Sequence, residues 1–397
     1  MIKKTTVGRM VFVSAVVIFL VTVSCSPYKQ DIPVLDLTES PGADYVSLFN
    51  GSDFAGWDIG REDGAWSVEN GIIHCKGAPA DPYLILSENE YENFDFYAEF
   101  KVSKDCNTGI FYHVPLAGRQ SRIGFETQIL DDHGMPPDKN STGSIYDVVP
   151  PVMNAMKKAG KWNQYHVRFD WPVCKVWLNG YLVQDVNFEE NPALKYRLRA
   201  GFLGLSNHGY TADYRNLWIR TLPDRDTGTD IFNGEDLDGW TVEGDADWHV
   251  EDGMIVSTQG EGYLVTEQEY DNVYFHAYAQ CDTLQDYHAR FYYRWTGADS
   301  PGYSADLYDF SDAVKYTEQY GGDIPPDIIR ADRSNWFFYR IVSADRQSNV
   351  YLNEFLTSDN KLLGKPPRGK IAIYRTAGDG VIRLKRLYLR PLNGPGL

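Results

Sequence analysis

Apolar and polar residues alternate along most of this chain, in short runs separated by turn residues. Residues 94–102 (FDFYAEFKV) alternate over most of their length, and Tyr165, Val167 and Phe169 share one face of a later run. A period of two is typical of β-strands, since successive side chains point to opposite faces of a sheet. Asn-Gly pairs within 68–73 and 174–183 predict tight hairpins. With no long helical period in the sequence, the pattern predicts an all-β fold of two-sheet sandwiches.

The same motifs occur twice in the same order, which sets the predicted number of domains. Residues 46–57 (VSLFNGSDFAGW) match 229–240 (TDIFNGEDLDGW), and 66–73 (WSVENGII) match 248–255 (WHVEDGMI). A repeat unit of this size indicates tandem domains rather than a solenoid. We predict a first domain at 44–222 and a second, divergent domain of the same type at 230–397. A polar linker at 223–229 joins them.

The first residues read as a targeting signal. Lys3, Lys4 and Arg9 precede an apolar run at 10–23 that is short for a membrane span. Ser24-Cys25 after this run resembles a bacterial lipoprotein box. It implies a signal peptide at 1–24, a lipid on the Cys25 thiol and a polar tether at 25–43. The chain would then be anchored in the envelope of a Gram-negative-type bacterium, at the periplasmic face or the outer membrane; the alternative is an ordinary secreted protein.

Composition narrows the range of partners. A net charge of −17 argues against a nucleic-acid partner. The aromatic content of 14% suits both core packing and stacking against sugar rings. The remaining cysteines, Cys75, Cys106, Cys174 and Cys281, match no zinc spacing, and we expect them to be mostly free and buried.

Residues 107–133 hold the most concentrated polar chemistry. Gly109, Phe111 and His113 share one face of a predicted strand, and Glu126 and Gln128 share one face of the next. Strict alternation therefore predicts that His113 and Glu126 meet on the same side of a sheet.

The first copy contains, in order, the motifs SLFNGSDFAGW, WSVENGIIHCKG, NTGIFYH, FETQILDDH, YDVVPP, KWNQY, VWLNG, SNHG and YRNLWIR. Together they resemble the 3-keto-disaccharide hydrolase domain family over nearly all of residues 45–222. The resemblance implies a concanavalin-like jelly roll in each copy. It also implies an exported enzyme that cleaves glycosides already oxidised at C3, by removal of the C2 proton, elimination of the aglycone and hydration. Such chemistry needs a base, an acid and a stabiliser for the enolate oxygen.

Several residues of this sequence match positions of the family motifs. Glu126 is the candidate base or metal ligand, against a structural carboxylate paired with an arginine. His208, before a glycine in a turn, is the candidate general acid or base. His113 is a further catalytic candidate. The candidates for substrate binding are Asn107, Gln128, Tyr146, Asp147 and Arg215.

No cofactor is implied with certainty, but a divalent metal ion is a candidate. Glu126, Asp131 and His133 carry the carboxylate and imidazole groups that such ions accept. The alternative is that residues 131–133 cap a turn. Oligomeric state stays open.

The second copy lacks much of this polar set. In its matching segments Arg294 replaces His113 and Ser304 replaces Glu126, and residues 374–380 replace the turn that contains His208. We therefore predict a binding or interface role for the second domain; a composite site at the junction is the alternative. For the whole protein, the alternative to the enzyme is a glycan-binding lipoprotein without catalytic activity.

Overall fold

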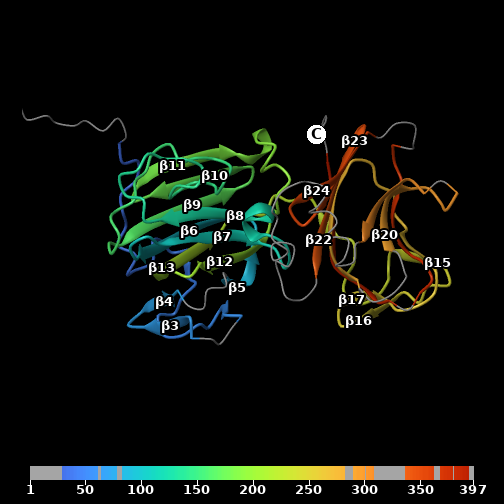
Figure 1. The fold of residues 1–397 in the computed structure, drawn as a ribbon, viewed down its shortest axis with the longest axis horizontal. Coiled ribbons are helices and arrows are strands. Elements are labelled where there is room, and N and C mark those ends of the chain that lie inside the picture. The colour runs from blue at the N-terminus through green and yellow to red at the C-terminus, as the bar shows by residue number, and fades with distance from the viewer. Residues whose placement is uncertain are drawn as a thin grey trace, which may run out of the picture.

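Two β-sandwiches lie side by side, the first blue to green and the second yellow to red in Figure 1. The structure is a computed structural model that describes residues 29–60, 64–77, 83–281, 289–299, 301–307, 336–361, 367–378 and 380–392. The predicted signal peptide and Cys25 lie outside the described residues. Within these ranges, no helix is long and apolar enough to cross a membrane.

The first sandwich consists of a large and a small antiparallel sheet. The large sheet has the order β11 (Tyr181–Asn187), β10 (Val173–Leu178), β9 (Asn163–Asp170), β6 (Phe94–Val102), β13 (Thr211–Thr221), β4 (Ile72–Lys76) and β3 (Trp66–Glu69), with β1 (Val46–Ser47) paired to β13. The small sheet has the order β2 (Trp57–Asp58), β5 (Tyr83–Tyr91), β12 (Gly201–Asn207), β7 (Asn107–Val114) and β8 (Phe125–Leu130). Helix α1 (Gln120–Ile123) lies between β7 and β8, and the 3-10 helix η1 (Phe188–Glu190) follows β11.

The second sandwich repeats this topology strand for strand. Its large sheet has the order β16 (His249–Glu251), β17 (Met254–Ser257), β26 (Ile382–Pro391), β19 (Val273–Cys281), β22 (Phe337–Ala344), β23 (Gln347–Leu352) and β24 (Phe355–Lys361), with β14 (Thr229–Asp230) paired to β26. Its small sheet has the order β15 (Trp240–Gly244), β18 (Gly262–Thr266), β25 (Lys370–Arg375), β20 (Ala289–Trp295) and β21 (Tyr303–Leu307). The predicted all-β fold of two tandem jelly-roll sandwiches is confirmed.

Local sequence explains much of this framework. Both predicted hairpins form: Asn70 and Gly71 have positive φ between β3 and β4, and Asn179 and Gly180 do so between β10 and β11. Two positive φ values in succession suit the right-handed twist of the flanking strands. Inward-facing apolar residues fill a separate core in each sandwich. The four cysteines expected to be mostly free and buried are all buried, and Cys75, Cys106 and Cys174 are free thiols.

The segment expected to be a polar tether is packed against the first sandwich where the structure describes it. Asp31 and Ile32 donate backbone hydrogen bonds to the Gly180 carbonyl, at 2.9 and 3.1 Å. Further along, the Trp218 indole donates to the carbonyl of Leu37, which is buried. Residues 31–37 of the predicted tether therefore lie against the first sandwich. The segment is mostly polar, but its Leu37 side chain is buried against the first sandwich.

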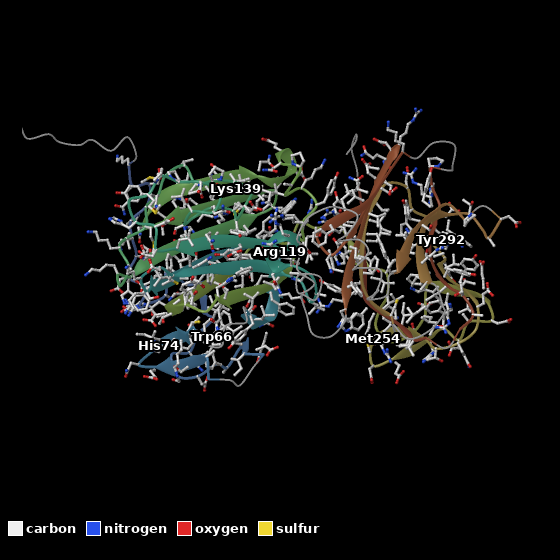
Figure 2. All side chains as sticks on the ribbon, viewed as in Figure 1. Trp66, His74, Arg119, Lys139, Met254 and Tyr292 are labelled. Carbon is white, nitrogen blue, oxygen red and sulfur yellow. The ribbon has the colours of Figure 1, made fainter. Side chains whose placement is uncertain are left out.

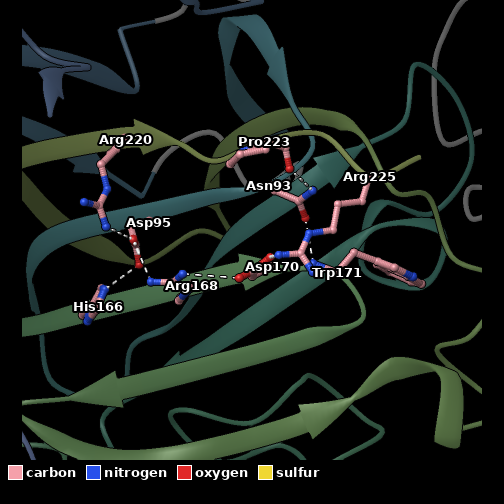
Figure 3. Close-up of polar contacts among 9 residues, drawn as sticks. All are labelled: Asn93, Asp95, His166, Arg168, Asp170, Trp171, Arg220, Pro223 and Arg225. Atoms are coloured by element: carbon pink, nitrogen blue, oxygen red, sulfur yellow. Dashed lines mark hydrogen bonds and ion pairs between the residues drawn. The ribbon is translucent and has the colours of Figure 1, made fainter. Parts of the chain in front are cut away.

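The linker is also held in place, by contacts at its first residues. Figure 3 shows Asn93 between two backbone partners: its amide nitrogen donates to the Pro223 carbonyl, and its amide oxygen accepts from the Trp171 backbone. Arg225 forms an ion pair with Asp170 at 2.7 Å. These contacts tie the start of the second sandwich to strands of the first.

An apolar cluster joins the two sandwiches. Ala117 and Ile123, from the β7–β8 connection, pack with Tyr278 and Phe338 of the second large sheet. The Tyr278 hydroxyl also accepts a hydrogen bond from the Leu116 backbone. The second sandwich therefore supports the β7–β8 connection directly, and this connection forms part of the cavity described next.

Candidate functional site

A cavity of about 210 Å³ lies on the outer face of the first small sheet. Its floor comes from β5, β7 and β8, because alternation directs Ile110, Tyr112 and Ile129 into the core and their neighbours outward. The turn after β12 and the β7–β8 connection supply its walls. The lining residues are Tyr83, Leu84, Asn107, Phe111, Arg119, Gln120, Ser121, Glu126, Gln128, Tyr146 and His208.

Glu126 is the most perturbed acidic group in this cavity. It pairs with Phe111 across β7 and β8, and its side chain extends over Gly109, where any Cβ would overlap the carboxyl group. The residue is 5% exposed, and its carboxyl makes no hydrogen bond with any residue that the structure describes. Burial raises its pKa to about 8, an effect that the nearby Arg119 guanidinium partly offsets. The pairing with an arginine that was the structural alternative for Glu126 is not formed.

His208 lines the same cavity from the turn that follows β12. Gly209 next to it has a φ of +84°, and its N–H donates to the Asn207 side chain, so the turn is well defined. The pKa of His208 is lowered, mainly by burial and further by the positive charge of Arg119. At neutral pH the cavity thus holds a neutral imidazole and a protonated carboxyl group. Environments that push two pKa values apart in this way are typical of acid–base pairs.

Three other predicted binding residues line the cavity. The Gln128 amide donates weakly to the Asn107 side chain, at 3.4 Å, and Gln128 is only 3% exposed. Tyr146 is placed by its backbone N–H, which donates to the Glu126 carbonyl at 3.0 Å. Amide and phenol groups around a cavity of this size suit a small ligand with several hydroxyl groups.

His113 is not part of this site, contrary to the prediction. Its φ of +51° marks a bulge, and β7 has an extra residue where it pairs with β12. The bulge turns the imidazole into the core, against Phe94, Phe125 and Phe169. The ring nitrogens face the carbonyls of Glu92 (2.8 Å) and Leu198 (3.1 Å). Burial lowers the pKa of His113 to about 4, as expected of a structural histidine.

Asp147 and Arg215 do not line the cavity either. Asp147 forms ion pairs with Lys139 and Arg122, and the hydrogen bond from Lys139, followed by the Arg122 charge, lowers its pKa. Arg215 lies on β13 of the large sheet, where it bonds Glu99 at 2.8 Å and stacks on the Trp162 ring. Both are held by structural partners, so the predicted substrate contacts are wrong for these two residues.

The candidate metal ligands are not brought together. The Asp131 carboxylate accepts from the Asp105 backbone at 3.1 Å, and the His133 ring bonds the Met156 carbonyl at 2.6 Å. In the part of the chain that the structure describes, no three His, Cys, Asp or Glu side chains gather as a metal site requires. Asp131 and His133 are each held by a backbone group distant in the sequence, and the trio with Glu126 is not formed.

Arg119 is the main residue that sequence reasoning missed. It stands beside α1, in a connection with no strand pattern, together with Gln120 and Ser121. Its charge acts on the pKa of both Glu126 and His208. Figure 2 places it on the side of the first sandwich that faces the second. The signal available in the sequence was the pair of arginines, Arg119 and Arg122, in the polar stretch GRQSR.

The second sandwich preserves the framework of this site without its chemistry. Arg294 has a φ of +54°, so the bulge at His113 is repeated, and Tyr292 pairs with Ser304 as Phe111 pairs with Glu126. Aromatic side chains gather on the same face of the second small sheet: the ring of Tyr263 lies 4.4 Å from that of Trp295 and 4.5 Å from that of Tyr374. The labelled Tyr292 in Figure 2 marks this face.

The fold and the cavity define a jelly-roll protein with a small polar site on its first sandwich. Residues 44–220 and 227–390 match the 3-keto-alpha-glucoside-1,2-lyase-like domain family, and the chain belongs to that family.

Individual proteins are similar to part of this chain. A 3-keto-disaccharide hydrolase from Bacteroides thetaiotaomicron is 26% identical over 227 residues, which cover 45% of this chain and 78% of that protein. The crystal structure of a candidate glycosyl hydrolase from Parabacteroides distasonis is 26% identical, with a TM-score of 0.41; the match covers 49% of this chain and all of that one. A carbohydrate-binding module from Bacillus subtilis is 15% identical, covering 43% of this chain and 98% of its own, with a TM-score of 0.32.

Proposed function

We propose that the first sandwich is an enzyme that cleaves the glycosidic bond of 3-keto-glycosides, with Glu126 and His208 as its acid–base pair. The observation that carries this proposal is the buried, unpaired Glu126 carboxyl in one cavity with a neutral His208. Family membership and the Bacteroides relative supply the substrate class.

The protonation states at neutral pH favour His208 as the base and Glu126 as the acid. The ketone at C3 acidifies the hydrogen on C2, and neutral His208 accepts that proton. The electron pair of the C2–H bond forms an enolate, whose oxygen lies on C3 and is stabilised by the Arg119 cation. The enolate collapses to a C1–C2 double bond as the C1–O bond breaks, and protonated Glu126 gives its proton to the leaving oxygen. Water then adds to the double bond, OH at C1 and H at C2, which completes a net hydrolysis.

The remaining lining groups bind and orient the sugar. Gln128, Asn107 and Tyr146 present amide and phenol groups to the hydroxyls that do not react. These contacts would hold the sugar with its C2 proton near His208. Holding reacting groups in position in this way contributes strongly to the rate.

The deciding assay is release of free sugar from a 3-keto-glucoside by the full chain. We expect release by wild type, loss in His208→Ala and Glu126→Gln, and full activity in Glu88→Gln, which changes an exposed glutamate on β5 outside the cavity. Deuterium at C2 of the substrate should slow the reaction and exchange with solvent. No release from any 3-keto substrate, with glycan binding retained, would instead support the binding-protein alternative.

We also propose that the chain is an exported lipoprotein of the cell envelope. The support is the basic start, the apolar run and Ser24-Cys25 in the sequence. Incorporation of labelled palmitate in the native host should occur in wild type and be lost in Cys25→Ala. Equal labelling of the two proteins would contradict this assignment.

A further inference from the structure

A second cavity, of about 390 Å³, lies at the junction of the two sandwiches. Arg119 lines both this cavity and the smaller one that contains Glu126, so the two share a wall. The first sandwich contributes the β7–β8 connection and the segment after η1, and the second contributes β22, β23 and the turn before β24. Its volume is in the range of about 300–1,000 Å³ that is common for small-molecule sites.

Positive charge dominates the walls of this junction cavity. Four arginines, Arg119, Arg122, Arg197 and Arg340, line it with one carboxylate, Glu354, among the residues that the structure describes. Arg122 has its own partner, Asp147, outside the cavity lining. An excess of buried positive charge is costly unless a negative group compensates it.

Arg197 shows this excess most clearly. It is 3% exposed, and its guanidinium donates only to backbone carbonyls, those of Ser121 (2.8 Å), Gly124 (3.0 Å) and Ala193 (3.1 Å). No carboxylate pairs with it among the described residues. Burial, together with the charges of neighbouring arginines, lowers its pKa to about 9.

Arg340 has hydrogen-bonding capacity that is not used. Arg340 is 7% exposed; it stacks on the Tyr351 ring at 4.0 Å and donates from Nη1 to the Tyr196 carbonyl at 2.7 Å. Its Nε is buried and has no hydrogen-bond partner within the described part of the chain. The Glu354 carboxyl is buried beside the backbone N–H groups of Glu354 and Arg119 and near the charges of Arg119 and Arg122. Buried polar atoms in native proteins are rarely left without a partner, so the spare donor of Arg340 is available to a group that enters the cavity.

We propose that the junction cavity binds the leaving half of the substrate, and that this half is a sugar carrying an oxyanion, either a carboxylate or a sulfate ester. The chemistry of the walls matches such a sugar. The oxyanion would accept from the arginine donors, the hydroxyls would donate to Glu354, and the faces of Tyr196 and Tyr351 suit a sugar ring. The position beside Arg119 follows from the proposed cleavage in the smaller cavity, on which this inference rests.

This proposal gives the second sandwich a specific role. Arg340, Tyr351 and Glu354 belong to its large sheet and the following turn, so the site is incomplete without the second sandwich. The second copy would thus have lost its own polar cavity and have become one wall of a site that the two copies share.

Calorimetry with simple sugars tests the site without any turnover. The probes are methyl glucuronoside, glucose 6-sulfate and, as the neutral control, methyl glucoside, each titrated into the full chain. We expect one or both anionic sugars to bind, and the neutral one to bind much more weakly. Which anionic sugar binds identifies the oxyanion. Loss of one charge-assisted contact should weaken binding about tenfold in Arg340→Gln. Arg346→Gln, an exposed arginine in the turn of the same hairpin, should bind like wild type.

Steady-state kinetics on a neutral and an anionic 3-keto substrate distinguish failure of the junction site from failure of the proposed function and from a misfolded variant. Arg346→Gln should retain the wild-type kcat/KM on both a neutral 3-keto-disaccharide and a 3-keto-glucosyl uronate. Arg340→Gln should keep the wild-type Tm, which shows that this variant is folded, and should lose less activity on the neutral substrate than on the uronate. With a 3-keto-glucosyl uronate its kcat/KM should fall about tenfold. Equal losses on both substrates, or no binding of either anionic sugar by wild type, would overturn the junction site. If binding depends on Arg340 but no 3-keto substrate is cleaved, the proposed function fails and the oxyanion site stands.

Discussion

Replacing Glu126 with glutamine should stabilise the protein, and the gain should increase with pH. Glu126 is 5% exposed, and no hydrogen bond or ion pair within the described residues compensates the burial of its charge. Glutamine has nearly the same shape and no charge, so the variant keeps the packing of β7 and β8 and removes only the cost of ionisation. The perturbation is thus electrostatic, and its magnitude follows from the pKa.

Burial raises the pKa of this carboxyl from 4.5 to about 8. A raised pKa in the folded state means that the fold binds the proton more tightly than the unfolded chain does. The resulting stability is fully present below pH 4.5 and is lost as pH rises through about 8. The slope is about 1.4 kcal/mol per pH unit in this window. By pH 7 the free energy of unfolding of wild type should therefore have fallen by roughly 3 kcal/mol through this titration. Glu126→Gln has no carboxyl group here and should show no such fall.

The assay is urea unfolding of wild type and Glu126→Gln, followed by tryptophan fluorescence between pH 5 and 8. Glu88→Gln on β5, an exposed position, serves as the matched control. The difference in the free energy of unfolding should grow with pH for Glu126→Gln and stay flat for Glu88→Gln. An infrared difference spectrum between wild type and Glu126→Gln should also show a protonated carboxyl band at pH 7.

Parallel stability curves for wild type and Glu126→Gln would refute the reasoning, since Glu126 would then titrate alike in the folded and unfolded states. An infrared difference spectrum that shows an ionised Glu126 carboxylate at pH 6 would also refute it. Either result would remove the basis for assigning Glu126 as the proton donor at neutral pH.

Three further substitutions test the site and its boundary. His208→Ala should lower kcat/KM by about 10²- to 10⁴-fold, and an unchanged rate would exclude His208 as the base. The acid limb of the wild-type pH profile should lie below pH 6.5, since the pKa of His208 is lowered. His113→Ala should cost about 2–4 kcal/mol of stability, because it leaves a cavity in the core, yet leave kcat of the folded protein unaltered; a kinetic loss without a change in Tm would place His113 in the mechanism after all. Gly109→Ala should lower kcat with little change in Tm, since the added methyl group displaces the Glu126 carboxyl. Steady-state kinetics and thermal melts test this. A lower Tm with an unchanged kcat would mean that the glycine serves only the fold.

Most of the framework could be predicted because its determinants are local. The Asn-Gly pairs at 70–71 and 179–180 adopt the positive φ values that a hairpin needs, whatever surrounds them. Alternation in 125–130 places Glu126 and Gln128 on one face, and the structure keeps them there. His208 could be found because a polar-His-Gly turn is a short motif with its own geometry.

The wrong predictions come from interactions between distant segments. His113 was assigned by strict alternation, but a single extra residue in β7 where it pairs with β12 reverses the direction of its side chain. Nothing in the residues of β7 marks that bulge. Arg215 matched a family position, yet β13 lies in the opposite sheet, where Glu99 is its neighbour across the strands.

The residues alone predict two domains, the strands and hairpins of each, and the carboxylate, amide and imidazole that are candidates for the site. These features depend on the period of two and on turn chemistry, which act over a few residues. Only the tertiary structure decided that Arg119 joins Glu126 and His208, that His113 is part of the core, and that the second sandwich forms a wall of an arginine-rich junction. The reason is physical: burial and charge at a site are set by whichever segments pack there, and here they come from connections and from a second domain far away in the chain.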